Sequence, residues 1–188
     1  MIITDDFIFV HVPKTGGGSM LYALGGPRKR GHIHAPLSSI EKNNRPAFGF
    51  VRNPWDRMVS LYSHLCQKTV APGRLPYQNN IAEKGFKWWL MKDQYYIGRE
   101  TAELQPLQVR SQMWWLDDCD WVGEFEILKQ DFELICADFG IKANELPHIN
   151  ASKHAYYSTY YDDESRAFVS EHFAPEIKRF SYQFEELI

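Results

Sequence analysis

The residues from Phe7 to Met20, FIFVHVPKTGGGSM, constrain the fold of this chain more than any other segment. Phe7 to Val12 is apolar at nearly every position and ends at a proline, which predicts a short buried strand. A lysine, a threonine, three glycines and a serine follow, and a helical pattern begins at Met20. A strand joined by a glycine turn to a helix suits a bound phosphate or sulfate group, because glycines let the backbone approach the anion.

The side chains of this turn strengthen the prediction of an anion site. Lys14 brings a positive charge, and Thr15 and Ser19 bring hydroxyl donors. In an ATP-type loop the lysine follows the glycines, whereas here it precedes them, and no ATP-type loop occurs elsewhere in the chain. The alternative is a plain strand-to-helix connection. The candidate binding residues are Pro13, Lys14, Thr15, Gly16, Gly17, Gly18, Ser19 and Met20.

A second junction of the same kind follows. Ala47–Val51 is an apolar run that predicts a buried strand, and the sequence RNPWDRMVSLYSHLC after it predicts a helix. Asn53 suits the N-cap of that helix and Pro54 its first position. Arg52 at the strand end and Ser60 two turns into the helix are candidates for a second phosphate. The alternative is an arginine that caps a carboxylate and a serine that faces solvent.

The rest of the chain alternates strand and helix patterns, which predicts an α/β fold. We expect a P-loop-like three-layer architecture, with a central, mainly parallel sheet flanked by helices, in a single domain over residues 1–188. Ligands of such sheets bind at the carboxyl ends of the strands. The further predicted elements are a strand at 121–125, helices at 83–92, 106–116, 128–139 and 162–173, a short helix from 175, and loops at 69–80 and 147–153.

Composition excludes several classes of protein. The net charge of −3 argues against general nucleic-acid binding. No apolar run has the length of a membrane span, and the first residues do not form a basic and then apolar leader, so we expect a cytoplasmic protein without membrane association. Cys66, Cys119 and Cys136 fit reduced thiols rather than disulfides. The histidines and cysteines lack the spacing of a zinc site, and we expect no metal.

The two junctions together resemble a known family. HVPKTGGGS, followed by FGFVRNPWDRMVSLY, is similar to the PAPS-dependent sulfotransferases of the carbohydrate-type and bacterial branch. The segments WVGEFEILKQDFELIC, LPHINASKHAYYSTYY and FSYQF are similar to later segments of that family. The resemblance implies that the first motif holds the 5′-phosphosulfate of PAPS and that Arg52 and Ser60 hold its 3′-phosphate. It also implies that Lys14 serves the leaving 5′-phosphate and that no metal takes part.

Two positions depart from the family pattern. The resemblance also places two further segments near the ligands. Glu124 stands where the family often has arginine, and Gly18 replaces its commoner threonine. Lys153 follows a segment that lies near the nucleotide in similar proteins, so it is a candidate phosphate ligand or, equally, a solvated lysine. Similar proteins also place the segment that begins with Arg110, Ser111 and Gln112 near acceptor and nucleotide.

An acceptor hydroxyl needs a proton acceptor, and histidine suits that role near neutral pH. The sequence RGHIHAPL supplies His32 and His34, and the family has a histidine in this region. Alignment on H-A-P favours His34 as the general base, whereas alignment on G-H-I favours His32, and both stay open. His11 is expected to pack or to orient other groups, with a hydrogen bond from its ring satisfied inside the protein.

The predicted function is transfer of a sulfuryl group from PAPS to an acceptor hydroxyl on a carbohydrate or small metabolite. One alternative is a P-loop kinase or nucleotide hydrolase, although the order of lysine and glycines speaks against it. Another is a non-catalytic nucleotide-binding protein on the same fold. The sequence does not reveal the acceptor. The chain is short for the family, and its open face leaves room for a small substrate or for a partner subunit in a homo-oligomer.

Overall fold

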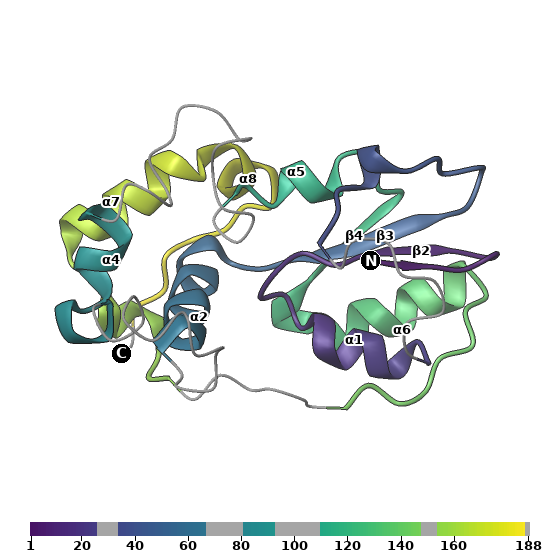
Figure 1. Ribbon diagram of the computed structural model, residues 1–188, viewed down its shortest axis with the longest axis horizontal. Helices are drawn as coiled ribbons and strands as arrows, with labels where there is room; N and C mark the ends of the chain where they lie inside the picture. Colours follow the sequence, from purple (N-terminus) through teal and green to yellow (C-terminus); the bar gives the residue numbers. More distant parts are fainter. Residues whose placement is uncertain (26–33, 67–80, 93–109, 148–153, 187–188) are drawn as a thin grey trace, which may run out of the picture. The chain divides into compact units, whose positions relative to one another are not determined.

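The computed structural model describes residues 1–25, 34–66, 81–92, 110–147 and 154–186 (Figure 1). The chain divides into two compact units. The first, here called the sheet unit, comprises Met1–Arg52 and Ser111–Ala151. The second, the helical unit, comprises Asn53–Arg110 and Ser152–Ile188. The prediction of a single domain over residues 1–188 stays a prediction.

The sheet unit holds a four-stranded sheet in the order β1-β2-β3-β4. Its strands are β1 (Ile2–Ile3), β2 (Ile8–Val10), β3 (Ala47–Val51) and β4 (Trp121–Glu124). β1 runs antiparallel to β2, whereas the other two neighbouring pairs are parallel. The predicted α/β fold with a mainly parallel sheet is therefore confirmed. Strand β1 was not predicted, because two residues are too short for a recognisable pattern.

Both faces of this sheet are covered by helices, and β3 shows why. Phe48 and Phe50 are fully buried in the core that also contains residues of α1 (Gly17–Ala23) and α6 (Leu128–Asp138), which lie on one face of the sheet (Figure 1). Gly49 points the other way, where a Cβ would lie 2.4 Å from Leu116 of α5 (Met113–Leu116). Successive residues of a strand face opposite sides, so the sheet unit is built in three layers.

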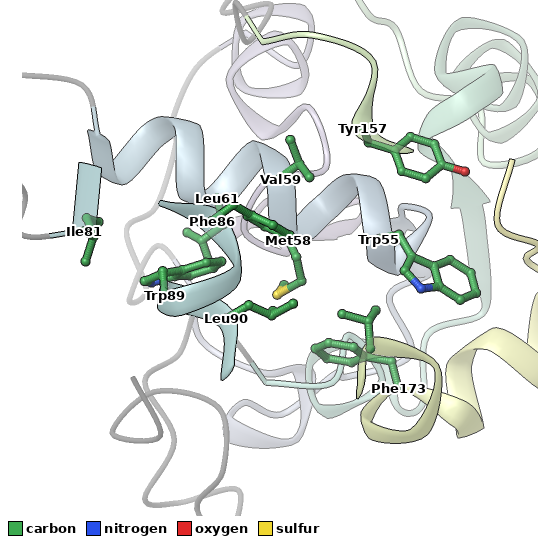
Figure 2. Close-up of a cluster of buried hydrophobic side chains, with 11 residues drawn as sticks. Trp55, Met58, Val59, Leu61, Ile81, Phe86, Trp89, Leu90, Tyr157 and Phe173 are labelled. Carbon is green, nitrogen blue, oxygen red and sulfur yellow. The ribbon is translucent and has the colours of Figure 1, made fainter. Parts of the chain in front are cut away.

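The helical unit contains α2 (Pro54–Cys66), α4 (Phe86–Lys92), α7 (Asp163–His172) and α8 (Ala174–Arg179). As predicted, Asn53 caps α2: its Oδ1 accepts a hydrogen bond from the backbone N–H of Trp55 at 3.1 Å. Asp162 caps α7 in a reciprocal arrangement with Ser165. Figure 2 shows the aromatic-rich core that these helices bury, which comprises Trp55, Met58, Val59, Leu61, Ile81, Phe86, Trp89, Leu90, Tyr157, Val169 and Phe173.

Some predicted elements have different bounds. The helix predicted from residue 83 begins at Phe86, because Gly85 has a φ of 84° and separates it from the preceding helical turn. Of the helix predicted at 106–116, the described part is helical at Met113–Leu116. β4 ends at Glu124, and Phe125–Ile127 form a short 3-10 helix, as do Leu37–Ser39 and Tyr157–Tyr160. The loop predicted at 69–80 lies outside the described residues.

Within the described ranges, no helix combines the length and apolar character needed to cross a bilayer.

Candidate functional site

The segment Lys14–Ser19, here called the glycine loop, connects β2 to α1 through a tight turn in the sheet unit. Lys14 has a φ of 73° and Gly16 a φ of 77°. That region is open to glycine but rare for lysine, so Lys14 carries local backbone strain. The Thr15 hydroxyl donates a hydrogen bond to the main-chain oxygen of Val12 at 3.0 Å and thereby closes the turn. Strain of this kind is found at many ligand-binding loops, and the ligand role of this loop stays a prediction.

Close packing explains two of the three glycines. A Cβ on Gly17 would lie 1.7 Å from Nε2 of His11, a distance that no side chain can occupy. A Cβ on Gly16 would lie 2.8 Å from Leu128 and 3.2 Å from the ring of Phe125. The loop is therefore pressed between His11 on one side and the start of α6 on the other. By contrast, Gly18 is exposed.

The last two predicted residues of this motif are buried. Ser19 is only 5 % exposed and Met20 is fully buried in the core of the sheet unit. The N–H of Met20 donates to the main-chain oxygen of Gly16 at 3.2 Å. The side chain of Met20 thus anchors α1 to the sheet, and its predicted ligand contact stays a prediction.

Arg52 meets the glycine loop inside the sheet unit. It follows β3 directly, and its Nη1 donates a hydrogen bond to the main-chain oxygen of Lys14 at 3.0 Å. Its guanidinium carbon lies 4.2 Å from the centre of the Phe125 ring, within the range of a cation–π contact. Because β2 and β3 are parallel neighbours, the groups at their carboxyl ends come together. The two cations that the sequence predicts for the donor site therefore share one edge of the sheet.

Gln112 fixes the backbone of Arg52. Its Oε1 accepts from the N–H of Arg52 at 2.9 Å, and its Nε2 donates to the main-chain oxygen of Arg52 at 2.8 Å. The side-chain amide of Gln112 thus makes the two hydrogen bonds that the backbone of a neighbouring strand would make with Arg52. Gln112 is fully buried. The resemblance had placed its segment near the ligands, but the sequence carries no signal for this clamp.

The electrostatics of this edge favour an anion. Burial, and after it the neighbouring charge of Arg52, lowers the pKa of Lys14 from 10.5 to about 8. An anion bound between the two cations would raise the pKa of Lys14 again, because its negative charge attracts the charged ammonium. The arrangement is therefore suited to a phosphate or sulfate group and strained without one.

His34 is held in one orientation beside His11. Its Nδ1 lies 3.0 Å from the main-chain oxygen of His11, and its own main-chain oxygen accepts from the indole N–H of Trp115 at 3.1 Å. A carbonyl oxygen can only accept, so Nδ1 of His34 carries the hydrogen. In the neutral ring Nε2 is then the nitrogen that can accept a proton.

His11 stays neutral. Burial, followed by the charges of His34 and the N-terminal amine, lowers the pKa of His11 from 6.5 to about 3. The predicted hydrogen bond from its ring is not made by Nδ1, which among the described residues is buried without a partner, so for Nε2 it stays a prediction. The ring packs instead, 4.4 Å from the ring of His34 between centroids.

The structure does not test the place of three predicted residues at this edge. Ser60 belongs to α2 of the helical unit, whereas Arg52 belongs to the sheet unit, so their pairing stays a prediction. Ser60 is 1 % exposed, and the alternative of a serine facing solvent is wrong. His32 and Lys153 lie outside the described residues.

Two further observations concern Glu124 and metal binding. The backbone N–H of Glu124 donates to Oδ2 of Asp131 at 2.6 Å, which joins the end of β4 to α6. In the part of the chain that the structure describes, no group of three or more histidine, cysteine or acidic side chains is placed to hold a metal ion.

Comparison with known proteins gives one match. A family model described as "Sulfotransferase family" matches residues 2–183, which is nearly the whole chain. A search of curated proteins and a search of solved structures gave no significant match.

Proposed function

Since this chain belongs to the sulfotransferase family and is therefore an enzyme of sulfuryl transfer, we propose that PAPS is its donor and a hydroxyl group its acceptor. The observation that carries the donor assignment is the contact between Arg52 and the main chain of Lys14. It brings two cations to the carboxyl ends of two adjacent parallel strands. A donor with two separated phosphates has the charge to match them.

The glycine loop fits the 5′ end of the donor. Its first helical N–H groups cannot bond within α1, and the turn leaves Gly18 exposed. Lys14 adds a charge that neutralises a leaving phosphate, which is how proteins promote transfer of phosphoryl and, by analogy, sulfuryl groups. We assign the 5′-phosphosulfate to the loop and the leaving oxygen to Lys14.

We assign the 3′-phosphate to Arg52 and Ser60. Support for Arg52 comes from its rigid placement: Gln112 holds its backbone, and Phe125 lies against its guanidinium. A positioned guanidinium binds phosphate with directed, charge-assisted hydrogen bonds. Ser60 and Lys153 enter the proposal through the resemblance alone.

We assign the general base to His34. PAPS supplies an activated sulfuryl group, and the protein must orient the acceptor and remove its proton. His34 meets the second need, because its Nδ1–H is committed to the main-chain oxygen of His11 and its Nε2 is the basic nitrogen. As the new sulfur–oxygen bond forms and the bond to the leaving phosphate breaks, the acceptor proton passes to Nε2 of His34. The acceptor class is a carbohydrate or a small metabolite.

A transfer screen with radiolabelled PAPS tests the assignment. The acceptors are sugars, phenols and alcohols, and we expect labelled product with the wild-type chain. The matched variants are His34→Ala and His32→Ala, and we expect loss of about a hundredfold or more in kcat for the first only. His64→Ala, a change at an exposed histidine of α2, is the control.

Two results would contradict the proposal. Failure of the wild-type chain both to label any acceptor and to bind 3′,5′-ADP would remove PAPS as the donor. Loss of activity in His32→Ala, with His34→Ala unaffected, would move the base to His32.

A further inference from the structure

The ring of His11 occupies the space that a side chain at position 17 would need. A Cβ built on Gly17 meets three atoms of that ring, Nε2 at 1.7 Å, Cδ2 at 2.0 Å and Cε1 at 2.5 Å. Gly17 is the first residue of α1, whereas His11 follows strand β2. The glycine at position 17 is therefore required by the imidazole, whatever it also does for a ligand.

The backbone of the same residue holds the proposed base. The main-chain oxygen of His11 lies 3.0 Å from Nδ1 of His34, and the two rings lie 4.4 Å apart between centroids. Displacing the His11 ring would turn its backbone and would also remove a packing surface of His34. One residue thus touches the glycine loop with its ring and His34 with its carbonyl group.

We propose that His11 is a positioning residue, whose ring, seated against Gly17, fixes the carbonyl group that holds His34 in its Nδ1–H tautomer. The inference rests on the proposed function, in which Nε2 of His34 accepts the acceptor proton. It links the donor loop to the base through one half-buried residue. A change in the glycine loop that moves the ring of His11 therefore also changes the tautomer of His34.

The ring of His11 works through its shape. Its Nδ1 has no hydrogen-bond partner among the residues described, so it gains nothing from a polar contact there. Burial keeps the pKa of His11 at about 3, and the charges that act on it are those of His34 and the Met1 amine. An imidazole that is neutral and packed on two sides is a spacer rather than a proton carrier.

The test is the tautomer of His34, read by nitrogen NMR of the imidazoles in the full chain at a pH where the ring is neutral. Four variants are compared with the wild type: His11→Ala, Gly17→Ala, the double variant of both, and Gly18→Ala. The first two displace or remove the same ring by different routes. Gly18→Ala is the matched control for the tautomer alone, which is read without donor, because it adds a methyl group at the neighbouring, exposed glycine.

We expect His34 to carry its hydrogen on Nδ1 in the wild type and in Gly18→Ala. In His11→Ala and in Gly17→Ala this tautomer should lose its dominance, and kcat should fall about tenfold, a part of what a general base contributes. The double variant should match His11→Ala, because the space left by the imidazole accepts the new methyl group. It also provides a well-packed protein should Gly17→Ala alone fail to fold.

Persistence of the Nδ1–H tautomer in His11→Ala would overturn the inference. It would also be overturned if the double variant lost more of this tautomer and of kcat than His11→Ala does alone. The tautomer is read without substrate, so this result is independent of the reaction. An unchanged kcat in His34→Ala would instead remove the base assignment of the proposed function.

Discussion

Two buried arginines, one in each unit, show how differently the two regions use the same side chain. Arg52 follows β3 in the sheet unit and bonds to the main chain of Lys14, another cation. Arg57 lies in α2 of the helical unit and is fully buried. Both its Nη atoms donate to the main-chain oxygen of Arg110, at 3.1 and 2.8 Å.

The difference separates the proposed ligand site from a structural contact. The guanidinium of Arg57 satisfies the buried main-chain oxygen of Arg110, and its carbon lies 5.7 Å from the centre of the Phe173 ring. The guanidinium of Arg52 lies instead beside Lys14, whose pKa burial and this like charge lower to about 8. Like charges held together cost stability, and such an arrangement is typical of a site that binds an opposite charge.

Removal of Lys14 should have the largest effect on activity. In Lys14→Ala we expect kcat/KM for sulfuryl transfer to fall about a thousandfold, because the charge that stabilises the leaving phosphate is lost. The free energy of unfolding should not fall, since a half-buried cation on a strained backbone is removed. Transfer assays and denaturant unfolding measure the two quantities. A variant with full activity would remove Lys14 from the reaction.

Removal of Arg57 should instead affect stability. In Arg57→Ala the free energy of unfolding should fall by about 3 kcal/mol, because a buried carbonyl group loses two donors and a cavity forms. Urea unfolding of the purified chain measures the change, and Arg52→Ala is the matched comparison, with an expected loss of only about 1 kcal/mol from the stacked ring. Equal losses in the two variants would erase the distinction between the two arginines.

The lowered pKa of Lys14 should make donor binding depend on pH. As pH rises through about 8, Lys14 loses its proton and its positive charge. The Kd of 3′,5′-ADP should therefore be about tenfold higher at about pH 9 than at about pH 7. The unfolded chain holds that proton up to higher pH, so the contribution of Lys14 to stability improves over the same rise. Calorimetry on Lys14→Arg is the control, because arginine stays charged and should flatten the profile. A profile in Lys14→Arg as steep as that of the wild type would contradict this cause.

The smallest expected effect concerns the ring under Arg52. Phe125→Leu removes the cation–π contact and should weaken 3′,5′-ADP binding about fivefold, whereas Phe125→Tyr, which keeps an aromatic face, should bind like the wild type. Binding by Phe125→Leu at full strength would show that Gln112 alone positions Arg52.

Regular elements could be predicted where the sequence carries a local pattern. The strand at Ala47–Val51 and the capped helix after Asn53 were predicted at their observed positions, because an apolar run and an N-cap are local signals. Lys14, Thr15 and Gly16 were predicted to form a site, and the structure brings Lys14 to Arg52 as the topology requires.

The supporting contacts could not be predicted, because they join residues far apart in the sequence. Gln112 binds the backbone of Arg52 across 60 positions, and nothing in the type of either residue indicates this pair. The positive φ of Lys14 likewise depends on tertiary packing rather than on local preference. The sequence predicts Gly17 as a ligand-binding residue. The structure shows that the ring of His11 also leaves no room for a side chain at this position.

The central claim is that Lys14 and Arg52 form one site for a doubly phosphorylated nucleotide. Titration calorimetry with 3′,5′-ADP, on the wild type, Lys14→Ala and Arg52→Ala, with Mg·ATP as the competing ligand, tests it most directly. We predict that the wild type binds 3′,5′-ADP in preference to Mg·ATP, and that each variant loses about tenfold to a hundredfold in affinity. Preference for Mg·ATP, or unchanged 3′,5′-ADP binding in both variants, would contradict it.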